Sequence, residues 1–253
     1  MSRFWLTTLL TAAAGLAGAI FLRHSAQTWF LASLAVLYAT IFAAGMTCIG
    51  SQFFCRAICG GDPSQNCVAL TFDDGPDPTV TPGLLDLLKR EQISATFFCI
   101  GRNVEAHPEL AKRMVAEGHL IGNHFFTHAW WTPFLLSRGL SDEMRRTQQA
   151  IERATGFVPT FVRPPVGLTN PYFPAALARV GLRMAGWNLR TFDTSKSAEA
   201  VILRIRSRVR PGSIIVLHNG RAQPAKLEEI LADVIPFVRS RGLGFARLDE
   251  MTA

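Results

Sequence analysis

The chain has 253 residues, of which 49% are hydrophobic and 18% are charged, and its formal net charge is +7. This length allows one large α/β domain, alone or with an additional segment. The basic residues are scattered and no nucleic-acid-binding motif is present, so the positive charge does not indicate a nucleic-acid partner.

Two apolar runs lie at the N-terminus. Residues 4–22 and 28–49 each have about the ~20 residues that a helix needs to cross a bilayer, and the polar segment 23–27 separates them. They predict a transmembrane helical hairpin over residues 1–50 and a membrane location, expected to be a bacterial inner membrane. The few flanking arginines do not orient the hairpin. The alternative is a secretory signal peptide with a cleavage site near residues 17–19.

The segment that follows is a predicted linker over residues 51–66, before a second domain over residues 67–253. Cys55 and Cys59 in this linker could form a disulfide bond or remain free thiols, because the five cysteines are an odd number. No paired C-x-x-C arrangement indicates a structural zinc site.

Short apolar runs alternate with helical patterns through the second domain. Strands are expected at residues 68–72, 95–100, 119–122, 160–163, 182–188, 213–217 and 244–248, and helices at 82–90, 108–117, 141–155, 174–180, 198–209 and 226–241. The helix over 141–155 is expected to begin with Ser141 as its cap. Alternating strands and helices predict a parallel sheet, and about seven such units predict an α/β fold closed into, or nearly into, a barrel.

The first predicted strand ends in the motif "VALTFDDGPDP", with Asp73 and Asp74 side by side. Two adjacent carboxylates repel, and one of them becomes harder to ionise unless a cation lies between them. One aspartate could therefore hold a metal ion while its neighbour acts as a base on water.

Further polar residues stand at or just after other strand ends. They are His124 and His128 in "GNHFFTH", Arg163 in "VRPPVG", Asp193 in "GWNLRTFDT" and His218 in "IIVLHNG". The carboxyl ends of parallel strands share one face of a barrel, where active sites form. Two histidines four residues apart on one helical turn would point the same way and suit one metal ion. With one aspartate they leave open positions, as in a catalytic site.

The remaining polar residues have two readings each. His218 is a candidate general acid, with Asp193 as a partner that orients it, although Asp193 could simply cap a loop. Arg163 could hold the base aspartate or mark a rigid strand exit.

The motifs "TFDDGP", "NHFFTH" and "RPPVG", the spacing from Trp187 to Asp193, and "LHN" resemble the five ordered motifs of the NodB-like polysaccharide deacetylases, carbohydrate esterase family four. The resemblance covers roughly residues 67–250. It implies that the domain is a distorted (β/α) barrel, preceded in this chain by the hairpin. It also implies an enzyme that removes acetyl groups from N-acetylated sugars. It also implies a divalent metal ion, with Zn²⁺ expected and Co²⁺ or Ni²⁺ as alternatives.

The resemblance further implies a role for each matching residue. Asp73 would be the base, Asp74, His124 and His128 the metal ligands, Arg163 the residue that holds the base, and His218 the acid with Asp193 as its partner. Residues Val166, Val216 and Leu217 would contact substrate, with the Val166 N–H as an oxyanion donor and Val216 beside the acetyl methyl group.

Some positions depart from the family pattern, and they bear on the substrate. Val166 stands where tyrosine is frequent, Thr194 where tryptophan is frequent, and Arg190 where an acidic residue is frequent. The expected partner is an N-acetylated glycan or glycolipid, together with the membrane, and no protein partner is expected. The alternatives are an O-acetyl esterase, an N-deformylase acting on a glycolipid, and an inactive carbohydrate-binding homologue.

An apolar stretch, "AWWTPFLL" at residues 129–136, follows the second histidine. Such a loop could be buried packing. Near a membrane anchor it could instead touch the bilayer or a lipid-linked substrate, because tryptophan favours membrane interfaces.

Overall fold

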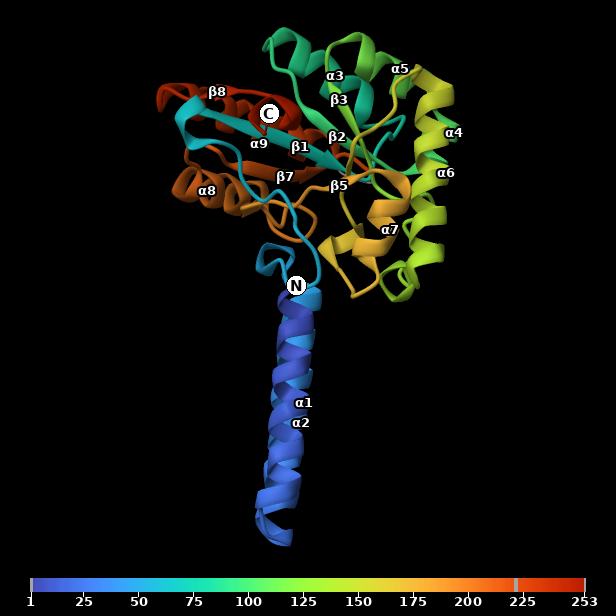
Figure 1. The fold of residues 1–253 in the computed structure, drawn as a ribbon. Coiled ribbons are helices and arrows are strands. Elements are labelled where there is room, and N and C mark those ends of the chain that lie inside the picture. Colours follow the sequence, from blue (N-terminus) through green and yellow to red (C-terminus); the bar gives the residue numbers. More distant parts are fainter. Residues whose placement is uncertain (1, 221–222, 253) are drawn as a thin grey trace.

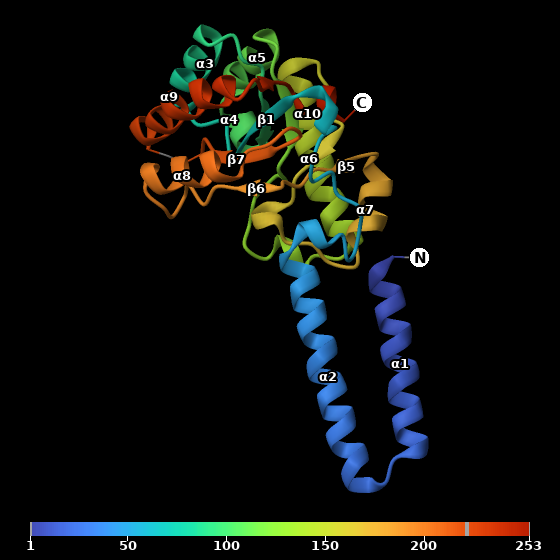
Figure 2. The same cartoon turned by 90° about the vertical axis from the view of Figure 1, so that its left-hand side faces the viewer.

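The computed structural model describes residues 2–220 and 223–252. Its N-terminal part is an antiparallel pair of helices, α1 (Arg3–Phe21) and α2 (His24–Thr47), that projects from the remainder of the molecule (Figures 1 and 2). Both helices are long and apolar enough to cross a membrane. Only 11% of an apolar 18-residue stretch of α1, and 6% of the corresponding stretch of α2, is buried. Helices of this length and composition near an N-terminus also fit a signal sequence.

The rest of the described chain alternates strands and helices. The strands are β1 (Cys67–Asp73), β2 (Thr96–Cys99), β3 (Leu120–Asn123), β4 (Phe161–Val162), β5 (Arg183–Met184), β6 (Leu189–Arg190), β7 (Ile214–His218) and β8 (Gly244–Phe245). The helices are α3 (Thr81–Arg90), α4 (Gly101–Ala106), α5 (Pro108–Ala116), α6 (Ser137–Thr155), α7 (Phe173–Val180), α8 (Ala198–Arg208), α9 (Pro224–Ser240) and α10 (Leu248–Met251).

The strands form one parallel sheet in the order β5-β4-β3-β2-β1-β7-β6, with β8 beside the start of β1. The sheet is curled and surrounded by helices, so the predicted distorted barrel of about seven strands is confirmed. In the central register Asp73 of β1 lies opposite His218 of β7. The carboxyl ends of neighbouring strands therefore bring distant polar residues together.

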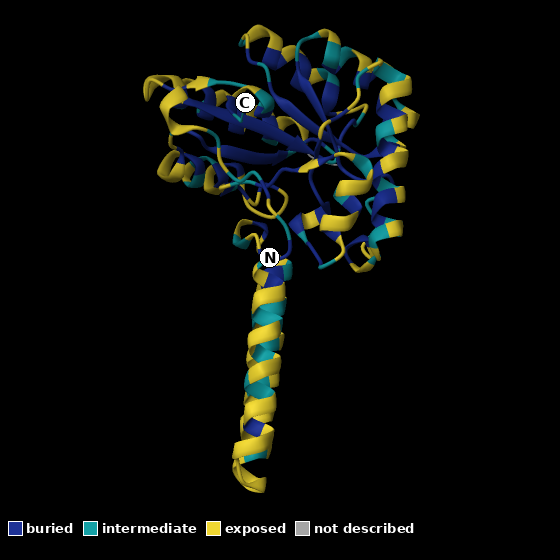
Figure 3. Cartoon of the chain, viewed as in Figure 1, coloured by how far each residue is buried: buried dark blue, intermediate teal, exposed yellow. Residues whose placement is uncertain are grey.

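The main core lies between the sheet and its helices, and Figure 3 shows the sheet buried and the hairpin exposed. All residues of β1 are buried, as expected for a central strand that is covered on both faces. Phe72 of β1 stacks on Phe97 of β2 with ring centroids 5.2 Å apart, which fixes the centre of the sheet.

Some predicted elements differ from the observed ones, and two observed helices were not predicted. Helix α6 begins at Ser137, not at a Ser141 cap, because buried Leu140 packs on the same helical face as Met144 and extends the helix. The strand predicted over 182–188 is shorter and is followed by the separate strand β6. Helices α4 and α10 were not predicted, and the strand predicted over 244–248 is shortened to β8 because α10 begins at Leu248.

The predicted linker runs along the edge of the sheet. Ile58 forms a parallel bridge with Ala185, and the Ile58 N–H donates to the Met184 carbonyl over 2.9 Å. Farther along, the Gly61 N–H donates to the Gly212 carbonyl over 3.0 Å. These contacts attach the segment to the domain by its backbone, and Cys55 and Cys59 within it are free thiols.

Candidate active site

The carboxyl edge of the sheet gathers the predicted metal ligands into one group. The ligand atoms of Asp74, His124 and His128 all lie within 4.8 Å of one another. The Nε2 atom of His124 is 3.3 Å from Asp74 Oδ1, and the Nε2 atom of His128 is 3.2 Å from the same oxygen. The Asp74 Oδ1 atom is buried and has no hydrogen-bond partner. A buried oxygen of this kind, faced by two imidazole nitrogens, fits a divalent cation.

The two histidines converge through a loop and not through the helical turn that their spacing suggested, because Phe125 and His128 have positive φ angles of 64° and 50°. Glu143 of α6 holds this loop. Its Oε2 atom accepts hydrogen bonds from the backbone N–H groups of Phe126 and Thr127, over 3.1 and 2.8 Å.

The tautomer of His124 is set by a backbone contact. Its Nδ1–H donates to the Arg163 carbonyl oxygen over 2.8 Å, because a carbonyl can only accept. The Nε2 atom points at Asp74, and in the neutral imidazole it is the nitrogen that carries the lone pair. A backbone carbonyl that accepts from the other ring nitrogen is the usual way in which proteins orient a metal-binding imidazole.

The charges of this group suit metal binding. Burial raises the pKa of Asp74, but the contact with His124 and the charges of His124, His128 and His218 outweigh it and lower the pKa to about 2. Burial, followed by the neighbouring His124, lowers the pKa of His128. The carboxylate is therefore ionised and the His128 imidazole favours its neutral form, which is the form that binds metals.

Asp73 belongs to a second, buried contact. Arg163 is fully buried, and its Nη1 atom donates to Asp73 Oδ1 over 2.7 Å and to Thr71 Oγ1 over 2.8 Å. Its Nη2 atom donates to the Gly186 carbonyl over 2.9 Å. Burial lowers the pKa of Arg163 and the neighbouring Asp73 opposes this effect. The guanidinium thus fixes the position of the Asp73 carboxylate.

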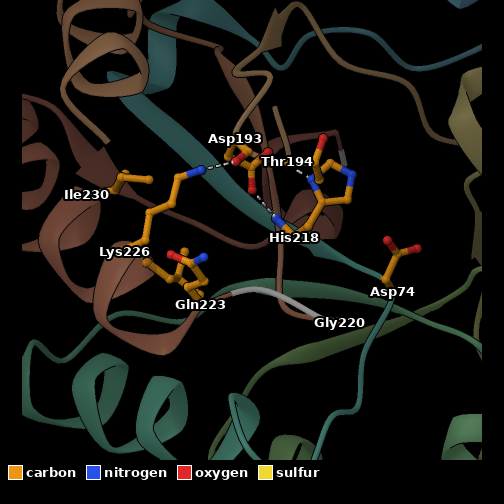
Figure 4. A pocket seen from close by; sticks show the side chains of 9 residues that line it. Asp74, Asp193, Thr194, His218, Gly220, Gln223, Lys226 and Ile230 are labelled. Carbon is orange, nitrogen blue, oxygen red and sulfur yellow. Dashed lines mark hydrogen bonds and ion pairs between the residues drawn. The ribbon is translucent and has the colours of Figure 1, made fainter. Parts of the chain in front are cut away.

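The third contact joins Asp193 to His218. The His218 Nδ1–H donates to Asp193 Oδ1 over 2.8 Å, and the His218 backbone N–H donates to Asp193 Oδ2 over 2.8 Å (Figure 4). Burial alone would lower the pKa of His218, but the hydrogen bond that it donates to Asp193 and the charges of Asp73, Asp193 and Asp74 raise the pKa to about 9. His218 is therefore positioned as a protonated imidazole.

Sequence reasoning missed two residues that support these contacts. Lys226 of α9 donates to the Asp193 carbonyl oxygen over 2.5 Å and lines a cavity of about 340 Å³ beside His218 (Figure 4). Glu143 lies in the second turn of α6 and holds the histidine loop. Neither contact leaves a local signal in the sequence, because each joins segments that are far apart along the chain.

A separate cavity of about 220 Å³ lies over the metal-ligand group. It is lined by Asp73, Asp74, His124, His128, Val166, Gly167, Trp187, Arg190, Phe192, Thr194, Val216 and His218. Val216 thus reaches the cavity, whereas the next residue along the strand, Leu217, is fully buried in the main core. The proposed substrate pocket accordingly excludes Leu217.

Backbone strain concentrates around this cavity. Four of its non-glycine residues, Asp74, His128, Val166 and Phe192, have positive φ angles of 74°, 50°, 58° and 62°. This conformation is a clear outlier for the β-branched Val166. Such residues cost about 1–3 kcal/mol each and cluster at functional sites.

A curled parallel sheet that carries these motifs in order along its carboxyl edge defines a NodB-type carbohydrate-active protein. A family model described as "Polysaccharide deacetylase" matches residues 60–185. The chain belongs to the polysaccharide deacetylase family.

Named relatives agree with this family. The chain is 34% identical over 192 residues to a peptidoglycan-N-acetylglucosamine deacetylase of Bacillus cereus, covering 73% of this chain and 67% of the relative. It is 38% identical over 159 residues to a chitooligosaccharide deacetylase of Bradyrhizobium, covering 60% of this chain and 70% of the relative. It is 34% identical to the deacetylase PgdA of Listeria monocytogenes but spans only 38% of that protein.

Solved structures share the fold. The Bc1960 peptidoglycan N-acetylglucosamine deacetylase superposes with a TM-score of 0.70 and 32% identity, covering 77% of this chain and 91% of that one. BA3943 from Bacillus anthracis, a family-four pseudoenzyme, superposes with a TM-score of 0.71 and 25% identity, covering 78% of this chain and 68% of that one. The fold therefore occurs both in enzymes and in a pseudoenzyme.

Proposed function

We propose that this chain is a metal-dependent hydrolase that removes an N-acetyl group from a sugar of a polysaccharide or a lipid-linked glycan. The observation that carries the proposal is the group formed by Asp74, His124 and His128, with Asp73 and His218 at the same edge of the sheet. The family and its named relatives supply the reaction class.

The donor set fits a divalent cation, for which Zn²⁺ is the first candidate and Co²⁺ or Ni²⁺ the alternatives. Asp74 would contribute a carboxylate oxygen, and His124 and His128 their Nε2 atoms. When bound, such an ion polarises the acyl carbonyl and lowers the pKa of water.

Asp73 is the proposed general base. Arg163 holds its Oδ1 atom, and both side chains are almost fully buried while Asp73 still lines the cavity. In this position the carboxylate can take the proton from the attacking water. The role of Arg163 is to fix the direction of that carboxylate, so it is a positioning residue.

His218 is the proposed general acid. An amine leaves an amide only when it is protonated, so a donor must stand on the leaving-group side. The Asp193 contact keeps Nδ1 engaged and leaves Nε2 as the atom that can donate into the cavity.

The acyl group would lie between Val166 and Val216 on the cavity wall. The Val166 N–H is the proposed donor to the oxygen of the tetrahedral intermediate, and the Val216 side chain the proposed neighbour of the acetyl methyl group. The strained backbone at Val166 supports this role, because a left-handed valine is retained only where the surrounding structure requires it.

We place the protein in a membrane through the hairpin of residues 1–50, with residues 51–66 as the connection and 67–253 as the deacetylase domain. The exposure of most apolar side chains on α1 and α2 supports this division. A cleaved signal peptide would remove the first helix, so the mature N-terminus of the purified protein decides between the two readings.

Release of acetate or formate tests the proposed function. The purified full chain is given an N-acetylated chitooligosaccharide, an O-acetylated sugar and an N-formylated sugar, each with and without a metal chelator. We expect metal-dependent release from the N-acetyl substrate. Preferential hydrolysis of the ester or the formamide would identify the alternative reactions, and no hydrolysis of any substrate would indicate an inactive homologue.

A further inference from the structure

The loop that follows the second histidine exposes large apolar side chains. Trp130, Trp131, Phe134 and Leu136 are 79%, 51%, 65% and 61% exposed. We call residues 129–136 the apolar loop. Contiguous exposed side chains of this size mark a surface that contacts a partner or a membrane.

The apolar loop is tied to the end of the hairpin through two consecutive residues. Asn170 Nδ2 donates to the Pro133 and Leu135 carbonyl oxygens over 2.7 and 3.0 Å. The Thr169 N–H donates to the Met46 carbonyl, in the last turn of α2, over 3.0 Å. In Figure 1 the start of α6, just after the loop, lies on the side of the domain from which the hairpin projects.

The catalytic cavity opens beside the same surface. The apolar loop begins directly after the proposed metal ligand His128, which lines the cavity. Val166, which also lines the cavity and is 57% exposed, precedes Thr169 by three residues. Three residues span at most ~11 Å, so the rim of the cavity lies close to the end of the hairpin.

The charge of this side of the molecule complements a lipid surface. Residues 1–61 and 129–141, which form the hairpin with its attachment and the apolar loop with the start of α6, contain no aspartate or glutamate, and they include the basic residues Arg56 and Arg138. Basic residues are attracted to anionic headgroups, and tryptophan favours the interface between headgroups and acyl chains.

We infer that the apolar loop rests on the bilayer into which the hairpin inserts, and that the cavity takes its N-acetylated sugar from a lipid-linked glycan in that bilayer. This inference rests on the proposed function and narrows its substrate class. A bilayer is the occupant that the structure favours, because the loop is hydrogen-bonded through Asn170 and Thr169 to the neighbourhood of a candidate membrane span.

The test compares two substrates of the full chain in nanodiscs that contain anionic phospholipid. One substrate is an N-acetylglucosaminyl glycolipid in the same nanodisc, and the other is a soluble chitooligosaccharide. For the variant W131S/F134S we expect the ratio of glycolipid to soluble turnover to fall by about tenfold, because the substrate's effective concentration at the cavity drops. The control is Leu203→Ser on α8, which is 60% exposed and should leave the ratio unchanged.

A binding measurement supports the kinetic one. Trp130 and Trp131 supply the tryptophan fluorescence that is present in wild type and missing from W130F/W131F. Lipids with brominated acyl chains should quench this part of the fluorescence, because the apolar loop rests on the bilayer. The inference is overturned if this quenching is absent, or if the ratio of glycolipid to soluble turnover is the same for W131S/F134S and for Leu203→Ser. In either case, turnover of the soluble substrate would leave the proposed function intact. If wild type hydrolyses neither substrate, the proposed function fails, and the quenching still decides whether the loop contacts lipid.

Discussion

The hairpin and the carboxyl edge of the sheet depart from ordinary globular packing in opposite ways. In the hairpin, side chains such as Leu10 and Leu16 are 62% and 65% exposed. At the sheet edge, Arg163 is 0% and Asp73 4% exposed. Exposed apolar surface and buried charge are the informative exceptions to hydrophobic burial. Each exception has its place in the proposed function: the exposed apolar helices would face a bilayer, and the buried charges would serve a cation and the substrate.

Removal of a metal ligand should have the largest effect. The variant His124→Ala is expected to lose about one metal ion per chain and to lower kcat by roughly 10⁴-fold, because the polarisation of the carbonyl is lost. Elemental analysis beside acetate release provides the measurement. Equal metal content in variant and wild type would remove His124 from the ligand set.

Loss of the proposed acid should be the next largest effect. His218→Ala should lower kcat on an amide by roughly 10²–10⁴-fold while the metal content stays that of wild type. An N-acyl substrate with a good leaving group needs less protonation and should lose less. Near-normal turnover of the ordinary amide would show that His218 is not the acid.

The buried ion pair predicts a large effect on stability. Arg163→Met leaves the Asp73 charge buried without its partner and should lower the free energy of unfolding by about 3–5 kcal/mol. The matched control is Arg239→Met, whose pair with Glu91 is half exposed and should contribute at most about 1 kcal/mol. Denaturant unfolding of both variants compares them, and similar losses would contradict the special role of the buried pair.

The boundary between the two regions can be located with shortened chains. A chain that begins at Cys48 keeps Ile49, which is buried in a core cluster of the domain, whereas one that begins at Gly60 loses it together with the Ile58–Ala185 bridge. Both should bind metal, and the shorter one should be less stable by about 1.5–3 kcal/mol. Thermal unfolding distinguishes them. Loss of metal by both would mean that the hairpin is part of the catalytic domain's structure.

The smallest effect concerns pH. His218 must be protonated to act as an acid. Because its pKa is raised to about 9, it stays protonated below pH 9, and activity should be lost as the pH rises through this value. A bound cation offsets the charge of Asp74, so the Asp193 contribution is the one that a variant can isolate. Asp193→Asn should move the alkaline limb of the kcat profile to lower pH by about one unit. An unmoved limb would show that another group titrates there.

Much of this architecture could be predicted from the sequence, because the signals are local. Alternating apolar runs predicted the parallel sheet, and strand-end polar residues such as Asp74 and His218 predicted the shared edge. The prediction that α6 begins at Ser141 was wrong, because the burial of Leu140 outweighs a favourable cap at Ser141. The contact of Glu143 with the histidine loop could not be predicted, because it depends on how α6 packs against β3.

The most direct test of the account is a metal titration of acetate release. The 253-residue protein is made metal-free with a chelator, supplied with increasing Zn²⁺ and given an N-acetylated chitooligosaccharide. Metal-dependent deacetylation predicts no acetate release without metal and a linear rise in the rate of release to a plateau at about one ion per chain. For His124→Ala the rate should not rise. Full turnover by the chelated protein, or an equal rise for the variant, would contradict it.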